Sequence, residues 1–148
     1  MEKFLVIVEC AIEFEGKFLF IKRPKSVHAE GLLAFPGGKV EHADGDENRD
    51  ILVQAIKREV LEEVNLDLVD PIHSLTSSYF IDSHHAHVLD VIFHCKIDNT
   101  SVEIKTSERE VPEYFWLTLG EVLNHENAPV WLKHYVSFLN EPATHRVP

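Results

Sequence analysis

Residues 37–66 decide the fold of this chain, and they read GGKVEHADGDENRDILVQAIKREVLEEVNL. The double glycine at the start permits backbone angles and close approaches that a side chain would forbid. An acidic loop follows, and a helical pattern rich in glutamate closes the stretch. A glycine corner facing helical carboxylates suits a divalent cation held against phosphate, because such cations prefer oxygen ligands. The stretch therefore predicts a metal-dependent enzyme that acts on phosphate esters or pyrophosphates.

The apolar spacing within this stretch predicts an α-helix that begins near Asn48 or Asp50 and ends near Val64. Both starting residues can cap a helix, and Asn65 suits a left-handed cap at the other end. One stripe is apolar at spacings of three and four residues: Val53, Ile56, Val60 and Val64. At about 100° per residue, three carboxylates share a neighbouring face: Glu59, Glu62 and Glu63. The helix thus has one face that packs and one that can bind.

Composition narrows the class of protein. The 148 residues are 45% apolar, which suits one globular domain with a sizeable core. We assign residues 1–141 to this domain and residues 142–148 to a C-terminal tail. The formal net charge of -11 repels polyanions, so a nucleic-acid polymer is not an expected partner. A small phosphorylated substrate is compatible with this charge, because bound divalent cations reverse the local field.

Cysteine usage and the N-terminus bear on the cellular compartment. Cys10 and Cys95 stand in apolar, strand-like runs without a CxxC motif, which predicts buried thiols of a reducing compartment. The N-terminus lacks the apolar run and cleavage site of a signal peptide. No stretch has the ~20 apolar residues that cross a bilayer. We expect a cytoplasmic protein with no membrane partner.

The remaining segments alternate between strand and helix signals. Strands are predicted at residues 4–14, 18–22, 75–81, 88–97, 102–105 and 114–117. Residues 42–48 predict a surface loop. A helical turn is expected at 119–124, and a final helix at 129–139 whose broad apolar face includes Trp131 and Tyr135. We predict that this face packs against the core, and it is also suited to a homodimer.

Residues 38–66 resemble the signature of the Nudix hydrolase family. That signature is Gly, five residues, Glu, seven residues, Arg-Glu, an aliphatic, any residue, Glu-Glu, any residue, Gly and an aliphatic. The matching positions are Gly38, Arg58-Glu59, Val60, Glu62-Glu63 and Leu66. The resemblance implies an α/β (α+β) fold, the Nudix-type α/β/α sandwich with a mixed β-sheet. It also implies the activity of a MutT-like nucleoside-diphosphate-X pyrophosphohydrolase.

Two departures from the signature stand out. Counting eight residues back from Arg58 places Asp50 where the family has Glu, and the path from Gly38 to Asp50 is six residues longer than the strict spacing. The loop between Glu41 and Asp50 is thus enlarged, and the sequence leaves its role open. The second departure is Asn65 in place of Gly, which is mild because Asn tolerates the left-handed conformation.

By this resemblance, the glutamates of the signature and a backbone carbonyl bind Mg²⁺ or Mn²⁺. The implied metal ligands are Gly37, Glu59, Glu62, Glu63 and a further acid, Glu110 or Glu113, of which we favour Glu113. The implied catalytic residues are Glu59, Arg58 and Glu62. A glutamate acts on the attacking water, and Arg58 orients Glu59 by a charge-assisted hydrogen bond. Which glutamate is the general base stays open.

Four further residues are candidates for substrate binding: Phe35, Lys39, Tyr79 and Phe80. The aromatic rings can stack on a base and Lys39 can contact phosphate, although each also suits a core or surface position. Deoxynucleoside triphosphates, ADP-ribose-like sugars, dinucleoside polyphosphates and nucleotide-linked alcohols are all open as substrates. An alternative function is that of a nucleotide-binding or sensing domain without turnover. The three helix glutamates and Arg58 together favour the enzyme.

Overall fold

The computed structural model describes residues 1–24, 31–98, 104–106 and 113–140. Its strands are β1 (Leu5–Phe14), β2 (Lys17–Lys22), β3 (Leu33–Ala34), β4 (Gly37–Lys39), β5 (His73–Ile81), β6 (His87–Lys96) and β7 (Glu113–Leu117). Its helices are the 3₁₀-helix η1 (His42–Asn48) and the α-helices α1 (Ile51–Val64), α2 (Leu119–Leu123) and α3 (Val130–Leu139). The strand predicted at 102–105 is absent at its described end, Ile104 and Lys105. The rest of that segment and the tail assigned to 142–148 lie outside the described residues.

In the described part of the chain, seven strands form one mixed sheet around the long strand β1. β1 pairs in parallel with β6 from Leu5 to Glu13. Its other edge is divided between two antiparallel partners. The end of β1 forms the predicted hairpin with β2, whereas Ile7, Val8 and Glu9 pair with β4. This division holds the glycine strand against the centre of the sheet.

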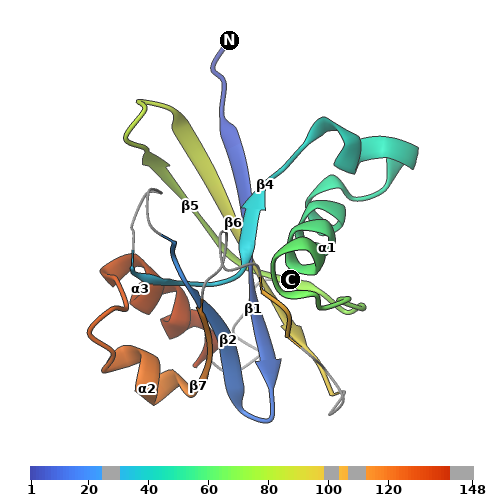
Figure 1. Cartoon of the computed structure of the whole chain (residues 1–148). Coiled ribbons are helices and arrows are strands. Elements are labelled where there is room, and N and C mark those ends of the chain that lie inside the picture. Colours follow the sequence, from blue (N-terminus) through green and yellow to red (C-terminus); the bar gives the residue numbers. More distant parts are fainter. Residues whose placement is uncertain (25–30, 99–103, 107–112, 141–148) are drawn as a thin grey trace.

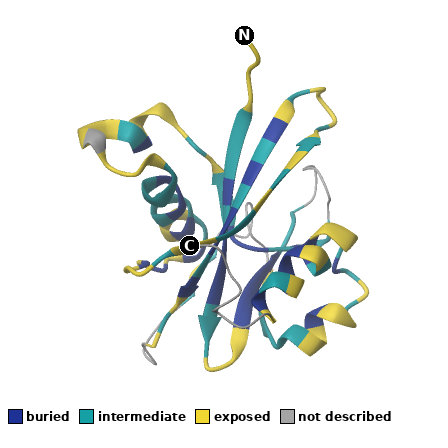
Figure 2. Ribbon diagram, turned by 180° about the vertical axis from the view of Figure 1, so that it is seen from behind, coloured by how far each residue is buried: buried dark blue, intermediate teal, exposed yellow. Residues whose placement is uncertain are grey.

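Helices cover both faces of the sheet (Figure 1). α1 packs on one face in an apolar cluster that includes Val8, Cys10 and Ile56. α2 and α3 cover the other face, where a second cluster includes Ala11 and Leu132. Figure 2 shows the buried residues along the central strands and on the inner sides of the helices. The predicted α/β/α sandwich is confirmed.

The ends of α1 also follow the sequence. Asp50 is the N-cap, and its Oδ1 accepts hydrogen bonds from two backbone N–H groups of the first turn, at 3.1 and 3.2 Å. Asn65 caps the other end with φ of 62°, the predicted left-handed conformation. The segment before α1 differs from the prediction, because residues 42–48 form η1 rather than a loop. Asp44 stabilises this turn by accepting a hydrogen bond from the backbone N–H of Glu41 at 2.8 Å.

The two cysteines are buried and unpaired, as the sequence predicts. Burial raises the pKa of both the Cys10 and the Cys95 thiol, which keeps them neutral. Among the described residues, no helix combines the length and the apolar character needed to cross a membrane.

Candidate active site

The glycine strand β4 lies beside α1, and backbone groups meet carboxylates there. The backbone N–H of Gly37 donates to Oε1 of Glu63 at 2.9 Å. A β-carbon at Gly38 would overlap the carboxylate of Glu59, and one at Gly37 would overlap the carbonyl oxygen of Val8 on β1. Gly37 is therefore required for β4 to pack against β1, and Gly38 leaves room for the Glu59 carboxylate beside β4.

Arg58 is the centre of a hydrogen-bonded network that joins α1, η1 and β4. Its Nε and Nη2 donate to the two carboxylate oxygens of Asp44 at 2.7 and 2.9 Å. Nη2 also donates to the carbonyl oxygen of Lys39 at 2.9 Å. Nη1 donates to Glu59 at 2.9 Å and to Glu62 at 3.3 Å. The bond from Arg58 to Glu59 that the resemblance implies is therefore present, and the same guanidinium reaches a second glutamate.

Charge and burial shift the pKa values within this network. The hydrogen bonds of Arg58 lower the pKa of the Asp44 carboxyl. The same contact, with Asp44 as the main cause, raises the pKa of Arg58. Burial raises the pKa of Glu59, although Arg58 acts in the opposite direction. A carboxylate with a raised pKa is a better proton acceptor, so its partial burial suits Glu59 to act on water, while Arg58 holds it in place.

The position of Asp44 revises the alignment with the family signature. Gly38 and Asp44 are separated by five residues, which is the spacing between the Gly and the Glu of the signature. The six additional residues therefore lie between Asp44 and Arg58. Asp50 serves as the N-cap of α1, and the contact with Arg58 belongs to Asp44. The enlarged loop folds as η1 and presents the buried Asp44 carboxylate to Arg58.

The carboxylates around Arg58 carry more negative charge than one guanidinium offsets. Arg58 faces Glu41, Asp44, Glu59 and Glu62, with the longest of these contacts at 3.8 Å. A surface of oxygen donors with net negative charge matches the ligand preference of Mg²⁺ and Mn²⁺. Within the described residues, no three acidic, histidine or cysteine side chains converge to form a ready metal site. The donor chemistry fits a divalent cation, and the ligand set stays a prediction.

The remaining predicted ligand lies on a different element. Glu113 begins β7 and pairs across the sheet with Lys22 of β2, and their charged groups are 3.6 Å apart. The alternative, Glu110, lies outside the described residues. The described contact of Glu113 is therefore with β2, and its role as a metal ligand stays a prediction.

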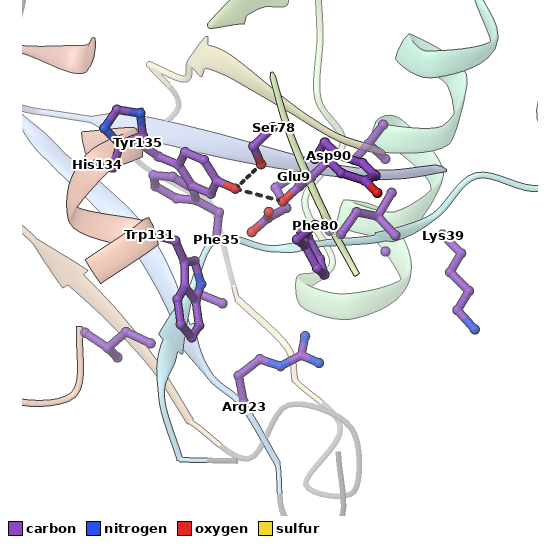
Figure 3. Close-up of a pocket in the computed structure, with 17 residues that line it drawn as sticks. Glu9, Arg23, Phe35, Lys39, Ser78, Phe80, Asp90, Trp131, His134 and Tyr135 are labelled. Carbon is purple, nitrogen blue, oxygen red and sulfur yellow. Dashed lines mark hydrogen bonds between the residues drawn. The ribbon is translucent and has the colours of Figure 1, made fainter. Parts of the chain in front are cut away.

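A cavity of about 580 Å³ opens between β4, β5 and α3 (Figure 3). All four predicted substrate-binding residues line it: Phe35, Lys39, Tyr79 and Phe80. The cavity also reaches Gly37 and Gly38, which contact Glu63 and Glu59 of α1. Strand β4 is therefore shared by the cavity and the carboxylate cluster.

Aromatic side chains and two cations shape this cavity. Phe35 is buried and stacks on Phe20, with ring centroids 5.2 Å apart. Trp131, which was predicted to pack in the core, is 49% exposed and lines the cavity. Arg23 and Lys39 also line it and bring positive charge. The cavity can therefore take a flat ring together with an anionic group.

Four polar side chains meet at the floor of the cavity (Figure 3). The Tyr135 hydroxyl lies 2.5 Å from Oγ of Ser78 and donates to Oδ2 of Asp90 at 3.3 Å. Burial raises the pKa of Glu9 well above its ordinary value, and the hydrogen bond and charge of Asp90 raise it further. Burial also raises the pKa of Asp90, although its hydrogen bonds with Glu9 and Tyr135 oppose this. The two acids therefore hold a proton more readily than exposed carboxylates do.

This polar floor is missing from the sequence-based prediction of the site. Two of its members left a signal, because Glu9 and Asp90 each interrupt an apolar strand and a buried acid needs a partner. Tyr135 gave no such signal, since it fits the apolar face of the final helix. Its hydroxyl, rather than its ring alone, contributes to the site.

Comparison with known proteins identifies the family to which this chain belongs. The family model of the NUDIX domain matches residues 5–138, so the chain belongs to the Nudix family. The resemblance found in residues 38–66 is thereby confirmed. Among curated proteins, the CTP pyrophosphohydrolase of Escherichia coli is 34% identical over 92 residues, which are 62% of this chain. The match spans 58% of the length of that protein.

Solved structures share the fold. A MutT NUDIX hydrolase from Burkholderia pseudomallei superposes with a TM-score of 0.75 at 21% identity, covering 94% of this chain and 100% of that chain. A MutT protein from Methanosarcina mazei Go1 gives a TM-score of 0.73 at 23% identity, covering 90% and 91%. At these identities the likeness concerns the fold alone.

Proposed function

We propose that this protein is a Mg²⁺- or Mn²⁺-dependent pyrophosphohydrolase that cleaves a nucleoside diphosphate linked to another group. The observation that carries the proposal is the shared strand β4. One side of this strand contacts Glu59 and Glu63, and the cavity opens along the same residues. A nucleotide with its base in the cavity would therefore extend its phosphates toward the carboxylates.

The cavity supplies groups for both ends of such a substrate. Trp131 offers an exposed indole on which a base can stack. Arg23 and Lys39 line the same cavity and can contact phosphate oxygens. Positioning and charge neutralisation account for most of the catalysis in phosphoryl transfer. A site that holds both the base and the phosphates of the substrate would therefore supply most of the rate acceleration.

The candidate ligands for the cation are the carboxylates of Glu59, Glu62 and Glu63 and the carbonyl oxygen of Gly37. When bound, Mg²⁺ would neutralise phosphate charge and acidify the attacking water. Glu59 or Glu62 would accept the proton of the attacking water. The water oxygen forms a bond to one phosphorus, and the bridging P–O bond breaks with its electron pair on the leaving phosphate. Arg58 positions both glutamates through its hydrogen bonds.

The similarity to a CTP pyrophosphohydrolase makes CTP and dCTP the first substrates to test. Hydrolysis between the α- and β-phosphates would release the nucleoside monophosphate and pyrophosphate. ADP-ribose, a dinucleoside polyphosphate and the other nucleoside triphosphates complete the panel, because they share the diphosphate linked to a nucleoside.

The test is release of product from this panel with Mg²⁺, with Mn²⁺ and with a chelator. The proposal predicts turnover of at least one nucleotide with either metal and loss of turnover with the chelator. Binding of nucleotides without turnover under any of these conditions would instead favour the alternative, a nucleotide-binding or sensing domain.

A further inference from the structure

We propose that the Glu9–Asp90 carboxyl pair at the floor of the cavity accepts a hydrogen bond from the exocyclic amino group of a nucleobase. The pair would select bases that carry an amino group over bases that carry an oxo group at the same place. This inference rests on the proposed function, because it concerns the half of that site that receives the base.

The strand register brings the two acids together. β1 and β6 run in parallel with Ile7 opposite Asp90 and Glu9 opposite Ile92. Glu9 and Asp90 are therefore diagonal neighbours on one face of the sheet. Ala11 and Ile92 on this face belong to the apolar cluster under α3. An acid buried at such a position is costly unless its oxygens find partners.

Asp90 has one carboxyl oxygen for which the neighbouring Glu9 carboxyl is the available partner within the described residues. The residue is 3% exposed, and its Oδ2 accepts from the Tyr135 hydroxyl. Its Oδ1 is buried and meets no N–H or hydroxyl donor within the described part of the chain. The carboxyl group of Glu9 is its neighbour and can supply a hydrogen bond only when it carries a proton.

The Tyr135 hydroxyl donates to Asp90, and this sets the direction of its hydrogen bond with Ser78. When Tyr135 donates its single proton to Asp90, its oxygen can only accept from Ser78, which lies 2.5 Å away. A proton shared between Glu9 and Asp90 is likewise used within the pair. Whether Glu9 and Asp90 together hold one proton or none, the carboxyl oxygens left for a ligand can only accept hydrogen bonds.

A row of acceptors requires N–H donors from the ligand. The amino groups of cytosine, adenine and guanine each carry two N–H bonds. An oxo group at the same position offers only acceptor lone pairs and would face the carboxylate oxygens directly. Sites built around buried hydrogen-bonding groups reject analogues that lack the partner far more strongly than apolar pockets do. The side wall formed by Trp131 is compatible with a purine or a pyrimidine ring.

The test uses nucleoside monophosphates in isothermal titration calorimetry, because their binding requires neither metal nor turnover. CMP is compared with UMP, AMP with IMP, and GMP with IMP. In the first two pairs an amino group takes the place of an oxo group, and the neighbouring ring nitrogen loses its hydrogen. In the third pair an amino group takes the place of a hydrogen atom. We expect the amino-bearing member of at least one pair to bind about tenfold or more tightly, in line with recognition by a buried acceptor. The nucleotide pair whose members bind with different affinities identifies the base that the cavity receives.

The variant Asp90→Asn tests the residue itself. Its amide offers an N–H donor as well as an acceptor, so an oxo-bearing nucleotide also finds a partner. The ratio of the two dissociation constants within the discriminating pair should therefore fall to about threefold or less. Asp67→Asn is the matched control, since Asp67 is exposed and lies outside the cavity lining; it should keep the wild-type preference. Thermal unfolding of both variants verifies their folding.

Equal binding within all three pairs by the wild-type protein would overturn the inference, and this comparison does not depend on any variant. A folded Asp90→Asn protein that keeps the full preference would overturn the role of Asp90. Failure of the proposed function has a different signature, which is amino-selective binding without hydrolysis of any nucleotide. Hydrolysis without amino selectivity would leave the activity in place and remove the inference.

Discussion

Asp44 and Arg58 are joined by two parallel hydrogen bonds, from Nε to Oδ1 at 2.7 Å and from Nη2 to Oδ2 at 2.9 Å. The Asp44 side chain is almost fully buried, so water does not compete for these bonds. Paired bonds of this kind fix the plane of a guanidinium as well as its position. The third nitrogen of Arg58 is thereby aimed at Glu59 and Glu62.

Replacing Asp44 by Asn should lower both stability and turnover. The loss of a charged, buried hydrogen-bond partner should reduce the free energy of unfolding at pH 7 by about 1–3 kcal/mol. The folded-state pKa of Asp44 is lowered, so its stabilisation is complete above the unfolded pKa of about 3.9 and is lost as the pH falls below it. Denaturant unfolding at pH 7 and pH 3 measures the difference between wild type and variant, which should shrink at pH 3. Equal stability at pH 7 would contradict the prediction.

Replacing Glu59 or Glu62 by Gln should lower turnover by about 10² or more, the usual weight of one catalytic acid or base. The amide keeps the size of the side chain and can still accept from Arg58, so the fold should be retained. Glu126→Gln is the control, because Glu126 is exposed between α2 and α3. Steady-state hydrolysis and circular dichroism provide the two measurements. Undiminished activity in both variants would remove the site assignment.

The two glycines of β4 should respond differently to alanine. In Gly38→Ala the new β-carbon displaces the Glu59 carboxylate, a side chain that can move, so the protein should fold and lose about 10² in turnover through misplacement. In Gly37→Ala the β-carbon meets the backbone of Val8, so stability should fall by about 1–3 kcal/mol. Gly120→Ala is the control and should be neutral or stabilising, since its site is open. A stable Gly37→Ala protein would show that β4 can shift.

Asn65→Gly should leave activity intact and keep or slightly raise stability, because Asn65 has φ of 62° and glycine adopts this angle freely. Asn65→Ala should cost about 1 kcal/mol at the same position. Thermal unfolding of the two variants measures both expected changes in stability. A large loss in Asn65→Gly would reveal a further role of the asparagine side chain.

Glu9→Gln should raise stability at pH 8. The folded-state pKa of Glu9 is raised, so the folded protein binds this proton more tightly and wild-type stability falls as the pH rises above the unfolded pKa of about 4.3. The neutral amide escapes this loss and can donate to Asp90. The melting temperature of the variant should therefore exceed that of wild type at pH 8, and the gap should narrow at pH 4. A gap that stays constant with pH would contradict the prediction.

The fold and the carboxylate half of the site could be predicted because their signals are local. The spacing of Val60, Glu59 and Glu62 depends only on the helical repeat, and the caps at Asp50 and Asn65 depend only on adjacent backbone. Local signals could not show where the six additional residues lie relative to the family signature. Counting from Arg58 or from Gly38 gives different partners, and the contact in space decides for Asp44.

The floor of the cavity depends on contacts between distant parts of the chain. Glu9 and Asp90 are 81 positions apart in sequence, and they meet because β1 and β6 are parallel neighbours. Tyr135 joins them from α3. No local pattern encodes which strands will be adjacent or which hydroxyl a buried acid will find, so these residues emerge only from the assembled sheet.

Glu9 of β1 pairs with Gly37 of β4, so the floor of the cavity and the strand beside the carboxylates are directly joined. The cavity proposed to receive the base and the carboxylates proposed to act on the phosphates meet at this pair of strands, with α3 beside the cavity and α1 carrying the carboxylates (Figure 1). Side chains on the α3 side can change without moving the backbone of α1, which carries Glu59, Glu62 and Glu63. If the proposed function holds, exchanging a few side chains at the floor would change the nucleotide preference and leave the carboxylates of α1 in place.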